Sequence, residues 1–309
     1  VFGCGAFDVG GVGGKWGEQL TTGSLPWWSI ALYYFAWVGF GGRMMGAAYT
    51  FAHKEGHNHN LYKKWIKNTV GNFFENMLGV WFGNVPYNFS TSHIVIHHRL
   101  DGGVGDTFYQ WDLDRSSLYD FMLYMYRILQ HMTGYSSLRF FYANGFTGQF
   151  YKLLKGCVVY HIVVPAAILY VTRSWSFLLW IYYQPLCCMA YFLAFLNFAF
   201  HGFIDFDENG VNIPCVNSTT IIEGDDDYFG EDDHMAHHYA TTVYFRDLKQ
   251  YQGTQLETWK KHHASVFRGL SIVELAIFII FGLWDKLAEH YVDYTGKMSK
   301  EEVAKMLEV

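Results

Sequence analysis

Two apolar segments, residues 157–172 and 177–200, are separated by only a few residues. A helix needs about 20 residues to cross a bilayer. The second segment is long enough, and the first becomes long enough when Leu153 and Leu154 are added. Because Arg173 and Ser174 make the connection short, the pair predicts an antiparallel transmembrane hairpin. Both open ends of such a hairpin lie on one side of the membrane, which restricts where the rest of the chain can fold.

The composition is also that of a membrane protein. Of the 309 residues, 51% are hydrophobic and 20% aromatic, and only 16% are charged. Soluble proteins carry more charge, and Trp and Tyr are enriched at lipid–water boundaries. The net charge of -6 is modest and much of the acid lies in residues 223–233, so we expect no nucleic-acid partner. Five cysteines without a C-x-x-C pair predict no disulfide framework.

The remaining apolar segments predict other kinds of helix. Residues 25–51 either cross the bilayer and bring His53 to its surface, or are divided by a kink or a tight hairpin at Gly41 and Gly42. Three further segments are too polar or too short to span, and we expect interfacial helices, the last of them re-entrant or interfacial, in residues 73–89, 118–142 and 270–284.

We therefore predict an all-α integral membrane protein with few transmembrane helices, interfacial helices and a histidine-rich cap on one membrane face. Residues 1–23 form a glycine-rich N-terminal segment, and residues 24–298 form the main domain. Residues 299–309 begin with capping-box spacing and predict a short C-terminal helix.

Histidines are concentrated in three short motifs and at one further position. In chain order the candidate metal ligands are His53, His57, His93, His97, His98, His201, His234, His237 and His238. On a helix, positions i, i+4 and i+5 can direct three imidazoles into one space, and clusters of this density are typical of metal sites. Zinc is satisfied by about four ligands. Nine histidines are too many for one zinc ion and favour two irons.

The predicted topology brings these motifs together. With one hairpin between the second and third motifs, all four histidine-bearing segments lie on one face of the membrane. Basic residues are concentrated on that face, namely Lys54, Lys63, Lys64, Lys67, Arg99 and Arg115. The hairpin tip offers only Arg173. The positive-inside rule then places the histidines on the cytosolic or equivalent organellar face.

The motifs H-x-x-x-H, H-x-x-x-H-H, N-x-x-x-H and H-x-x-H-H occur in this order, with the hairpin between the second and third. In the order of these motifs and the position of the hairpin, residues 25–245 resemble the membrane fatty-acid desaturase/hydroxylase superfamily. The segments 201–205 (HGFID) and 217–221 (NSTTI) look like its desaturase-like branch. The family usually has a transmembrane hairpin before its first motif, whereas here one apolar run precedes it. Either that run folds as two short pieces or a further span is missing.

The resemblance implies a di-iron centre that uses O2 and two electrons to desaturate or hydroxylate an acyl chain. The nine histidines would be iron ligands, and Asn197 would hold an iron-bound water. The implied partners are the lipid bilayer, an acyl lipid substrate and an electron donor such as cytochrome b5 or ferredoxin.

Several other polar residues are candidates for lesser roles. His59 is either an additional ligand or a second-shell or surface residue, and His161 is expected to bond to a neighbouring helix. Carboxylates close to the motifs can orient ligand histidines by accepting their second N–H, and the candidates are Asp106, Asp205, Asp232 and Asp233. We expect His131, His262, His263 and His290 at the surface.

A second class of function remains open. The aromatic content and the glycine-rich start also suit a desaturase-like subunit retained for structure in a larger membrane complex, because exposed aromatic residues favour protein–protein contact. Intact histidine motifs favour the enzyme, because a subunit that no longer catalyses a reaction is expected to lose these motifs first.

Overall fold

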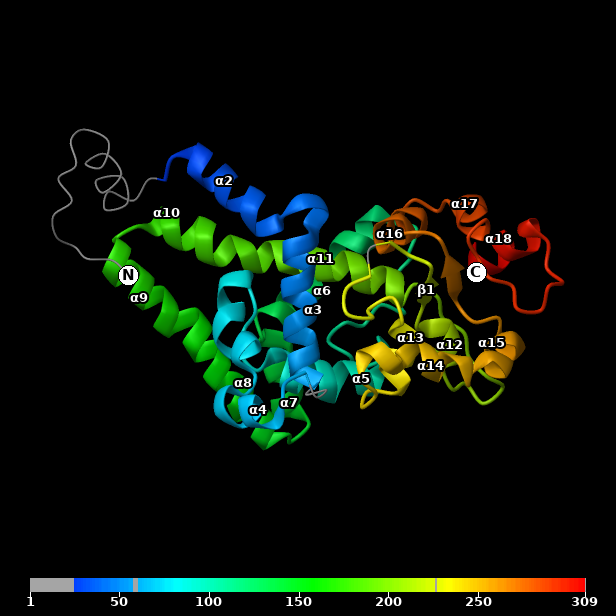
Figure 1. Cartoon of the computed structure of the whole chain (residues 1–309), viewed down its shortest axis with the longest axis horizontal. Coiled ribbons are helices and arrows are strands. Elements are labelled where there is room, and N and C mark those ends of the chain that lie inside the picture. Colours follow the sequence, from blue (N-terminus) through cyan, green and yellow to red (C-terminus); the bar gives the residue numbers. More distant parts are fainter. Residues whose placement is uncertain (1–24, 58–60, 226, 309) are drawn as a thin grey trace.

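The computed structural model describes residues 25–57, 61–225 and 227–308. Helices dominate these residues, as predicted (Figure 1). One small sheet was not predicted. Its strands β1 (Thr220–Ile222) and β2 (Val266–Arg268) pair in parallel, with Thr220 opposite Val266. The glycine-rich N-terminal segment and His59 lie outside the described residues.

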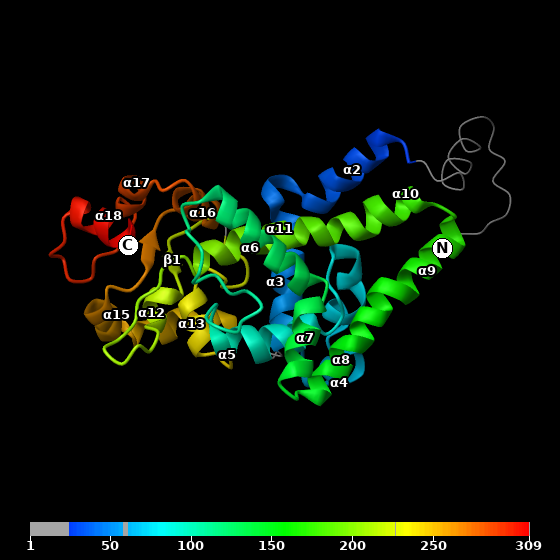
Figure 2. The same cartoon turned by 180° about the vertical axis from the view of Figure 1, so that it is seen from behind.

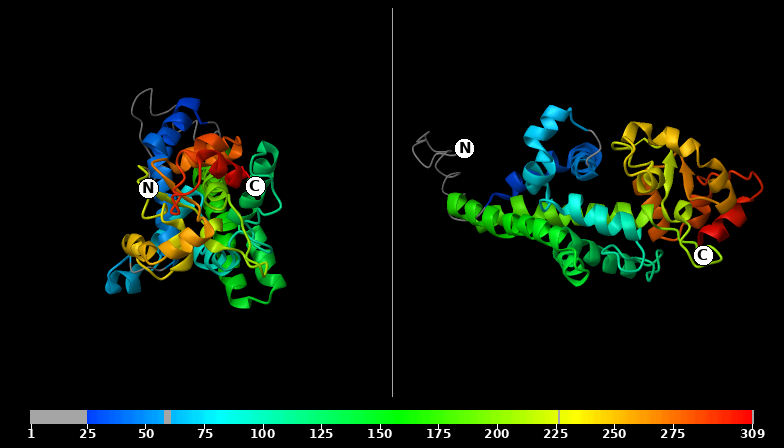
Figure 3. Two further views of the ribbon diagram at one scale, coloured as in Figure 1. Left: turned by 90° about the vertical axis from the view of Figure 1, so that its right-hand side faces the viewer. Right: turned by 90° about the horizontal axis from the view of Figure 1, so that it is seen from below.

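Two long helices form the predicted hairpin. The first runs over Thr147–Thr172 and the second over Trp175–Phe200. Within the described residues these are the two helices long and apolar enough to cross a membrane. Arg173 adopts a left-handed conformation at the turn, and the Ser174 hydroxyl accepts the Phe177 N–H. Figure 1 shows the hairpin tip at the left, and Figure 3 shows the C-terminal elements at the opposite end of the molecule.

Each long helix contains a π-helical section. The first consists of α8 (Thr147–Val158), η5 (Val159–Val163) and α9 (Val164–Thr172). The second consists of α10 (Trp175–Phe177), η6 (Leu178–Tyr183) and α11 (Gln184–Phe200). The wider turns of η5 and η6 are followed by Pro165 and Pro185, whose missing N–H groups cannot continue regular helical bonding.

The first apolar run is divided rather than continuous. Helix α2 (Trp27–Val38) ends at Gly39, whose φ of 71° favours glycine. The short 3-10 helix η1 (Phe40–Gly42) follows, and α3 (Arg43–His57) then leaves in a new direction (Figure 1). Of the alternatives left open by the sequence, this division corresponds to two short pieces.

The main core surrounds α11. Helices α3, α6 (Leu118–Met132) and α16 (Ile272–Ile280) contribute buried apolar side chains to it, including Ala52, Tyr124 and Leu275. α6 and α16 both pack on α11. Segments 118–142 and 270–284 are therefore helical as expected, with α7 (Tyr135–Ala143) completing the first.

The other elements are short. In chain order they are α4 (Lys64–Val70), η2 (Phe74–Leu78), η3 (Gly79–Phe82), η4 (Phe89–His97), α5 (His98–Leu100), α12 (Pro214–Asn217), α13 (His234–Tyr239), η7 (Phe245–Asp247), α14 (Leu248–Gly253), α15 (Leu256–His262), α17 (Trp284–Ala288) and α18 (Lys300–Glu308). The predicted capping box begins α18, because Ser299 N–H donates to Glu302 and Glu302 N–H donates to the Ser299 hydroxyl.

Candidate metal centre

Four separate elements carry the predicted histidines. His53 and His57 lie in the C-terminal part of α3, and His201 directly follows α11. The second motif runs through η4 into α5, and the third occupies α13. Figures 1 and 2 show α3, α5 and α13 gathered near the C-terminal end of α11. Segments far apart in the sequence therefore meet at one place.

The histidines form two groups, and in each group one nitrogen per ring lies within 4.8 Å of the others. The five-histidine group consists of His53, His57, His93, His98 and His237. The three-histidine group consists of His97, His201 and His238. Both groups are largely buried, so their ring nitrogens are shielded from solvent. The remaining candidate, His234, borders the second group, with its Nε2 3.0 Å from the Nε2 of His201.

The second motif is divided between the two groups because its helix is π-helical. The His98 N–H donates to the His93 carbonyl, five residues earlier. In an α-helix residues five apart point about 140° away from each other, whereas a π turn brings them close. The Nε2 atoms of His93 and His98 are thus 3.0 Å apart, while His97 joins the other group. The spacing alone was expected to direct all three imidazoles into one space.

Asp106 orients His97 from outside the three-histidine group. Its Oδ2 accepts the Nδ1 hydrogen of His97 at 2.9 Å and the Gly102 N–H at 2.9 Å, and its Oδ1 accepts the Phe108 N–H. Burial raises the pKa of Asp106, but His97 and these hydrogen bonds outweigh burial and lower it below its usual value. The ionised carboxylate fixes the Nδ1 proton of His97 and leaves Nε2 free to bind a metal.

Glu231 orients His53 in the same way, from outside the five-histidine group. Its Oε1 lies 3.0 Å from His53 Nδ1 and 2.8 Å from the ammonium of the buried Lys54. Burial raises the pKa of Glu231, yet the two neighbours lower it to about 2. Sequence analysis did not single out this residue within its acidic segment. Its partner His53 is 178 residues away in the sequence, and its position three residues before His234 was the available local signal.

Asp101 is a third outer carboxylate that the sequence did not reveal. It lies 2.9 Å from His238 Nδ1 and 3.7 Å from His201 Nδ1. The Asn217 amide donates to its Oδ2 at 2.9 Å, and the Asn217 carbonyl accepts from His201 Nδ1 at 3.0 Å. Burial raises the pKa of Asp101, but His238 lowers it well below its usual range. Its position three residues after His98 was the available local signal.

The orientation of the rings suits a bound cation. With Nδ1 of His53 committed to Glu231, its Nε2 has one lone pair, yet two other Nε2 atoms, those of His57 and His237, each lie 3.1 Å away. One lone pair cannot serve two N–H donors well, whereas a shared cation explains the convergence. The buried Nε2 atoms of His97 and His238 have no hydrogen-bond partner in the described part of the chain. These residues fit a metal site.

Burial keeps most of these imidazoles neutral. It lowers the pKa of His93, His98, His234 and His237 well below the usual value, and neighbouring histidines lower each pKa further. A neutral imidazole is the form that binds metals.

The other predicted residues have varied positions. Asn197 is buried and donates to the Tyr124 hydroxyl at 2.7 Å. Asp233 is buried one residue before α13 and accepts from Gln252 at 2.7 Å, and burial raises its pKa to about 6. Asp205 is exposed and caps the Phe206 N–H. The Asp232 carbonyl accepts the Ile221 N–H, and Asp232 is buried.

Two further histidines can now be placed. His161 lies 3.0 Å from the Thr133 carbonyl at the end of α6, as expected for a bond to a neighbouring helix. The surface position predicted for His131 is wrong. His131 is 2% exposed and bonds to Thr107 and Ser137, and burial lowers its pKa to about 3. It lies on the buried face of α6, whose apolar periodicity was the missed signal.

Comparison with known proteins assigns no family. No protein-family model, curated protein or solved structure matches the chain. Function is therefore inferred from the residues of the site.

Proposed function

We propose that the chain is a membrane di-iron oxidoreductase that uses O2 to desaturate, or hydroxylate, an acyl chain. The observation that carries the proposal is the pair of adjoining histidine groups at the C-terminal end of a long apolar helix. Each group has at least one histidine held by an outer carboxylate, through Glu231 in the first and Asp106 and Asp101 in the second.

The ligand set favours two irons over zinc. Structural zinc sites use about four ligands, usually including cysteine. The two groups offer eight histidines, with His234 beside them, and no cysteine belongs to either group. Imidazole suits iron, and outer carboxylates increase the basicity of the histidines that they contact.

The residues of the chain would hold the ions and exclude water. When bound, two irons would supply the oxidising chemistry, in which removal of two hydrogens from adjacent carbons consumes O2, two electrons and two protons and releases two waters. The electrons require an external donor, for which cytochrome b5 and ferredoxin are the candidate classes. Asp106, Glu231 and Asp101 would fix the imidazole orientations throughout.

Membrane placement supports an acyl substrate. The helices Thr147–Thr172 and Trp175–Phe200 are long and apolar enough to hold the protein in a bilayer, and His201 immediately follows the second. The centre would then lie close to lipid. Exposed basic residues such as Lys63 and Lys64 favour the cytosolic or equivalent organellar face.

Metal analysis tests the proposal. The full chain, purified in detergent, is expected to contain about two irons, and lipids from an expressing host should contain a new double bond or hydroxyl group. Folded protein that contains zinc alone, or no metal, would rule out the di-iron proposal. Because desaturation and hydroxylation share the first hydrogen abstraction, product analysis distinguishes them.

One observation favours the alternative of a structural subunit in a larger membrane complex. Helix α2 has 12 residues, too few to cross a bilayer, yet Trp27, Phe35 and nearby Phe40 are highly exposed. These rings need lipid or a neighbouring protein to cover them. Purification from the native membrane in mild detergent distinguishes the two. A lone particle with lipid-oxidising activity supports the enzyme, and a large stoichiometric complex without turnover supports the subunit.

A further inference from the structure

His131 is a buried histidine outside the two histidine groups. It lies in α6 and is 2% exposed, and burial lowers its pKa to about 3, so the imidazole is neutral. Its Nδ1 lies 3.0 Å from the Thr107 hydroxyl and 3.1 Å from the Ser137 hydroxyl. Its Nε2 lies 3.4 Å from the amide nitrogen of Asn88, the residue that precedes η4. Buried polar groups that satisfy one another in this way fix the geometry of the elements that carry them.

Asn88 determines which ring nitrogen of His131 carries the hydrogen. The Asn88 side chain also contacts the His131 carbonyl oxygen, at 3.3 Å. Because a carbonyl oxygen only accepts, the contacting atom of Asn88 is its amide nitrogen, a donor. The same nitrogen faces Nε2, so Nε2 accepts and we assign the ring hydrogen to Nδ1. The Thr107 hydroxyl oxygen can then accept the Nδ1 hydrogen, which leaves the hydrogen of Thr107 free for another acceptor.

Thr107 connects His131 to Asp106. The Thr107 hydroxyl lies 3.5 Å from Asp106 Oδ1, a long hydrogen bond that the charge of the carboxylate favours. Two backbone N–H groups and the His97 Nδ1–H are the other donors to this carboxylate. A carboxylate offers about four lone-pair positions, so four donors saturate Asp106. Its carboxylate cannot turn without losing a hydrogen bond, and the His97 ring is held with it.

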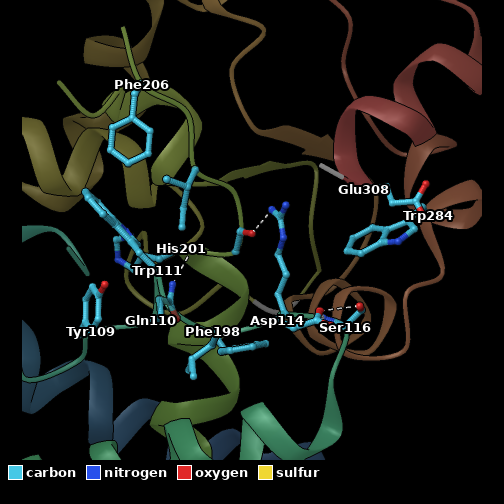
Figure 4. Close-up of a pocket in the computed structure, with 14 residues that line it drawn as sticks. Tyr109, Gln110, Trp111, Asp114, Ser116, Phe198, His201, Phe206, Trp284 and Glu308 are labelled. Carbon is cyan, nitrogen blue, oxygen red and sulfur yellow. Dashed lines mark hydrogen bonds between the residues drawn. The ribbon is translucent and has the colours of Figure 1, made fainter. Parts of the chain in front are cut away.

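Helix α6 also holds the loop that carries Thr107. Arg127, one turn before His131, donates to the Tyr109 carbonyl at 2.7 Å. Later residues of the loop line a cavity of about 520 Å³ beside His201 (Figure 4). Neither His131 nor Thr107, both in the described part of the chain, belongs to the wall of that cavity. The hydrogen bonds that reach Asp106 are therefore separate from the cavity.

We propose that His131 is a positioning residue for His97 and acts through Thr107 and Asp106. The inference rests on the proposed metal centre, in which His97 Nε2 binds a metal. His131 orients the Thr107 hydroxyl, the hydroxyl completes the four donors to Asp106, and the carboxylate holds the His97 ring and its Nδ1 hydrogen. Loss of the hydroxyl would leave one lone pair of a buried carboxylate without a donor, and His97 would be held less firmly.

Binding of Co²⁺ to the metal-free full chain in detergent, measured by competition with a chelator, tests the proposal. Thr107→Val keeps the shape of the side chain without its hydroxyl and should weaken Co²⁺ binding about three- to tenfold, the effect of one hydrogen bond. Thr107→Ser restores the hydroxyl and should restore the affinity. Ser137→Ala is the matched control and should leave the affinity unchanged, because it removes the other hydroxyl beside His131 Nδ1 and not the one beside Asp106.

A double substitution separates positioning from packing. Asp106→Asn interrupts the connection by itself, because an amide has one acceptor oxygen and cannot serve both His97 and Thr107. Thr107→Val should therefore cause no further loss of Co²⁺ affinity in the Asp106→Asn variant, whereas an independent packing defect would add to the loss. His131→Leu should weaken Co²⁺ binding at least as much as Thr107→Val. If His131→Leu does not fold, the Thr107 variants decide the outcome.

The outcomes distinguish this proposal from the proposed oxidation. Equal Co²⁺ affinity in Thr107→Val and Ser137→Ala overturns the role of His131, as does an additive loss in the double variant. A wild-type chain that binds no Co²⁺ overturns both this role and the metal centre. If the expected pattern is found in a chain that holds no iron or forms no oxidised lipid, the oxidation fails and the role of His131 stands, because the measurement requires neither iron nor turnover.

Discussion

At the scale of single residues, the outer carboxylates make the first prediction. Asp106→Asn removes one of the oxygens that hold His97 while preserving size. We expect metal affinity to fall by about 10- to 100-fold, as is typical when an outer-shell partner is lost, with the fold retained. Competition with a chelator measures the change. Asp205→Asn is the matched control, because Asp205 is exposed and its side chain accepts the Phe206 N–H. Equal affinities in the two variants would contradict the role of Asp106.

Substitution of the candidate ligands gives the second prediction. His98→Ala and His237→Ala each remove a member of the five-histidine group and should abolish turnover and release iron. His161→Ala removes a bond to Thr133 but no member of either group, so iron content and turnover should both be kept. Iron content and product formation are the measurements. Full iron content in His237→Ala would exclude His237 as a ligand.

The sequence predicted individual residues where the signal was local. The candidate ligand histidines were identified because each motif has helical spacing, and all nine lie in or beside the two groups. His59, the uncertain ligand, lies outside the described residues. Glu231 and Asp101 were not found, because their contacts with His53 and His238 depend on tertiary folding. The surface position of His131 was predicted from its polarity and is wrong, because His131 lies on the buried, apolar face of α6.

At the scale of elements, close packing of α8 gives the third prediction. A Cβ at Gly156 would overlap the Pro86 carbonyl oxygen, whereas a Cβ at Gly148, in the same helix, would meet no atom within 4 Å. Gly156→Ala should destabilise the protein by about 1–3 kcal/mol despite the gain in helix propensity. Gly148→Ala should be neutral or mildly stabilising. Thermal unfolding in detergent compares them, and equal midpoints would contradict this packing.

Elements were predictable where composition and length decide them. The hairpin and the capped α18 followed from apolar length and from Ser299 with Glu302. The π-helical turns of η4 were not predictable, because they depend on how the second motif packs against the other elements. This local widening brings His93 beside His98 and moves His97 to the other group. The sheet of β1 and β2 was missed because each strand has only three residues.

At the scale of the whole molecule, the two groups join parts of the chain that are far apart in the sequence. The five-histidine group links α3, η4, α5 and α13, and the three-histidine group links η4, the end of α11 and α13. Sequence order could indicate that these segments share a membrane face, but not which imidazoles share a group. Metal ions bound by the two groups would therefore cross-link segments that are distant in the sequence.

Metal removal consequently gives the last prediction. A ligand that binds only the folded state stabilises it by about 2.7 kcal/mol when present at 100 times its Kd. Chelation should therefore lower the thermal midpoint of the full chain in detergent, and iron should restore it. His237→Ala should show a much smaller iron-dependent change, because the five-histidine group is incomplete. His262→Ala, a half-buried histidine outside both groups, should keep the full change. An identical midpoint before and after chelation of the iron-loaded wild-type protein would show that the two groups do not bind a structure-stabilising metal.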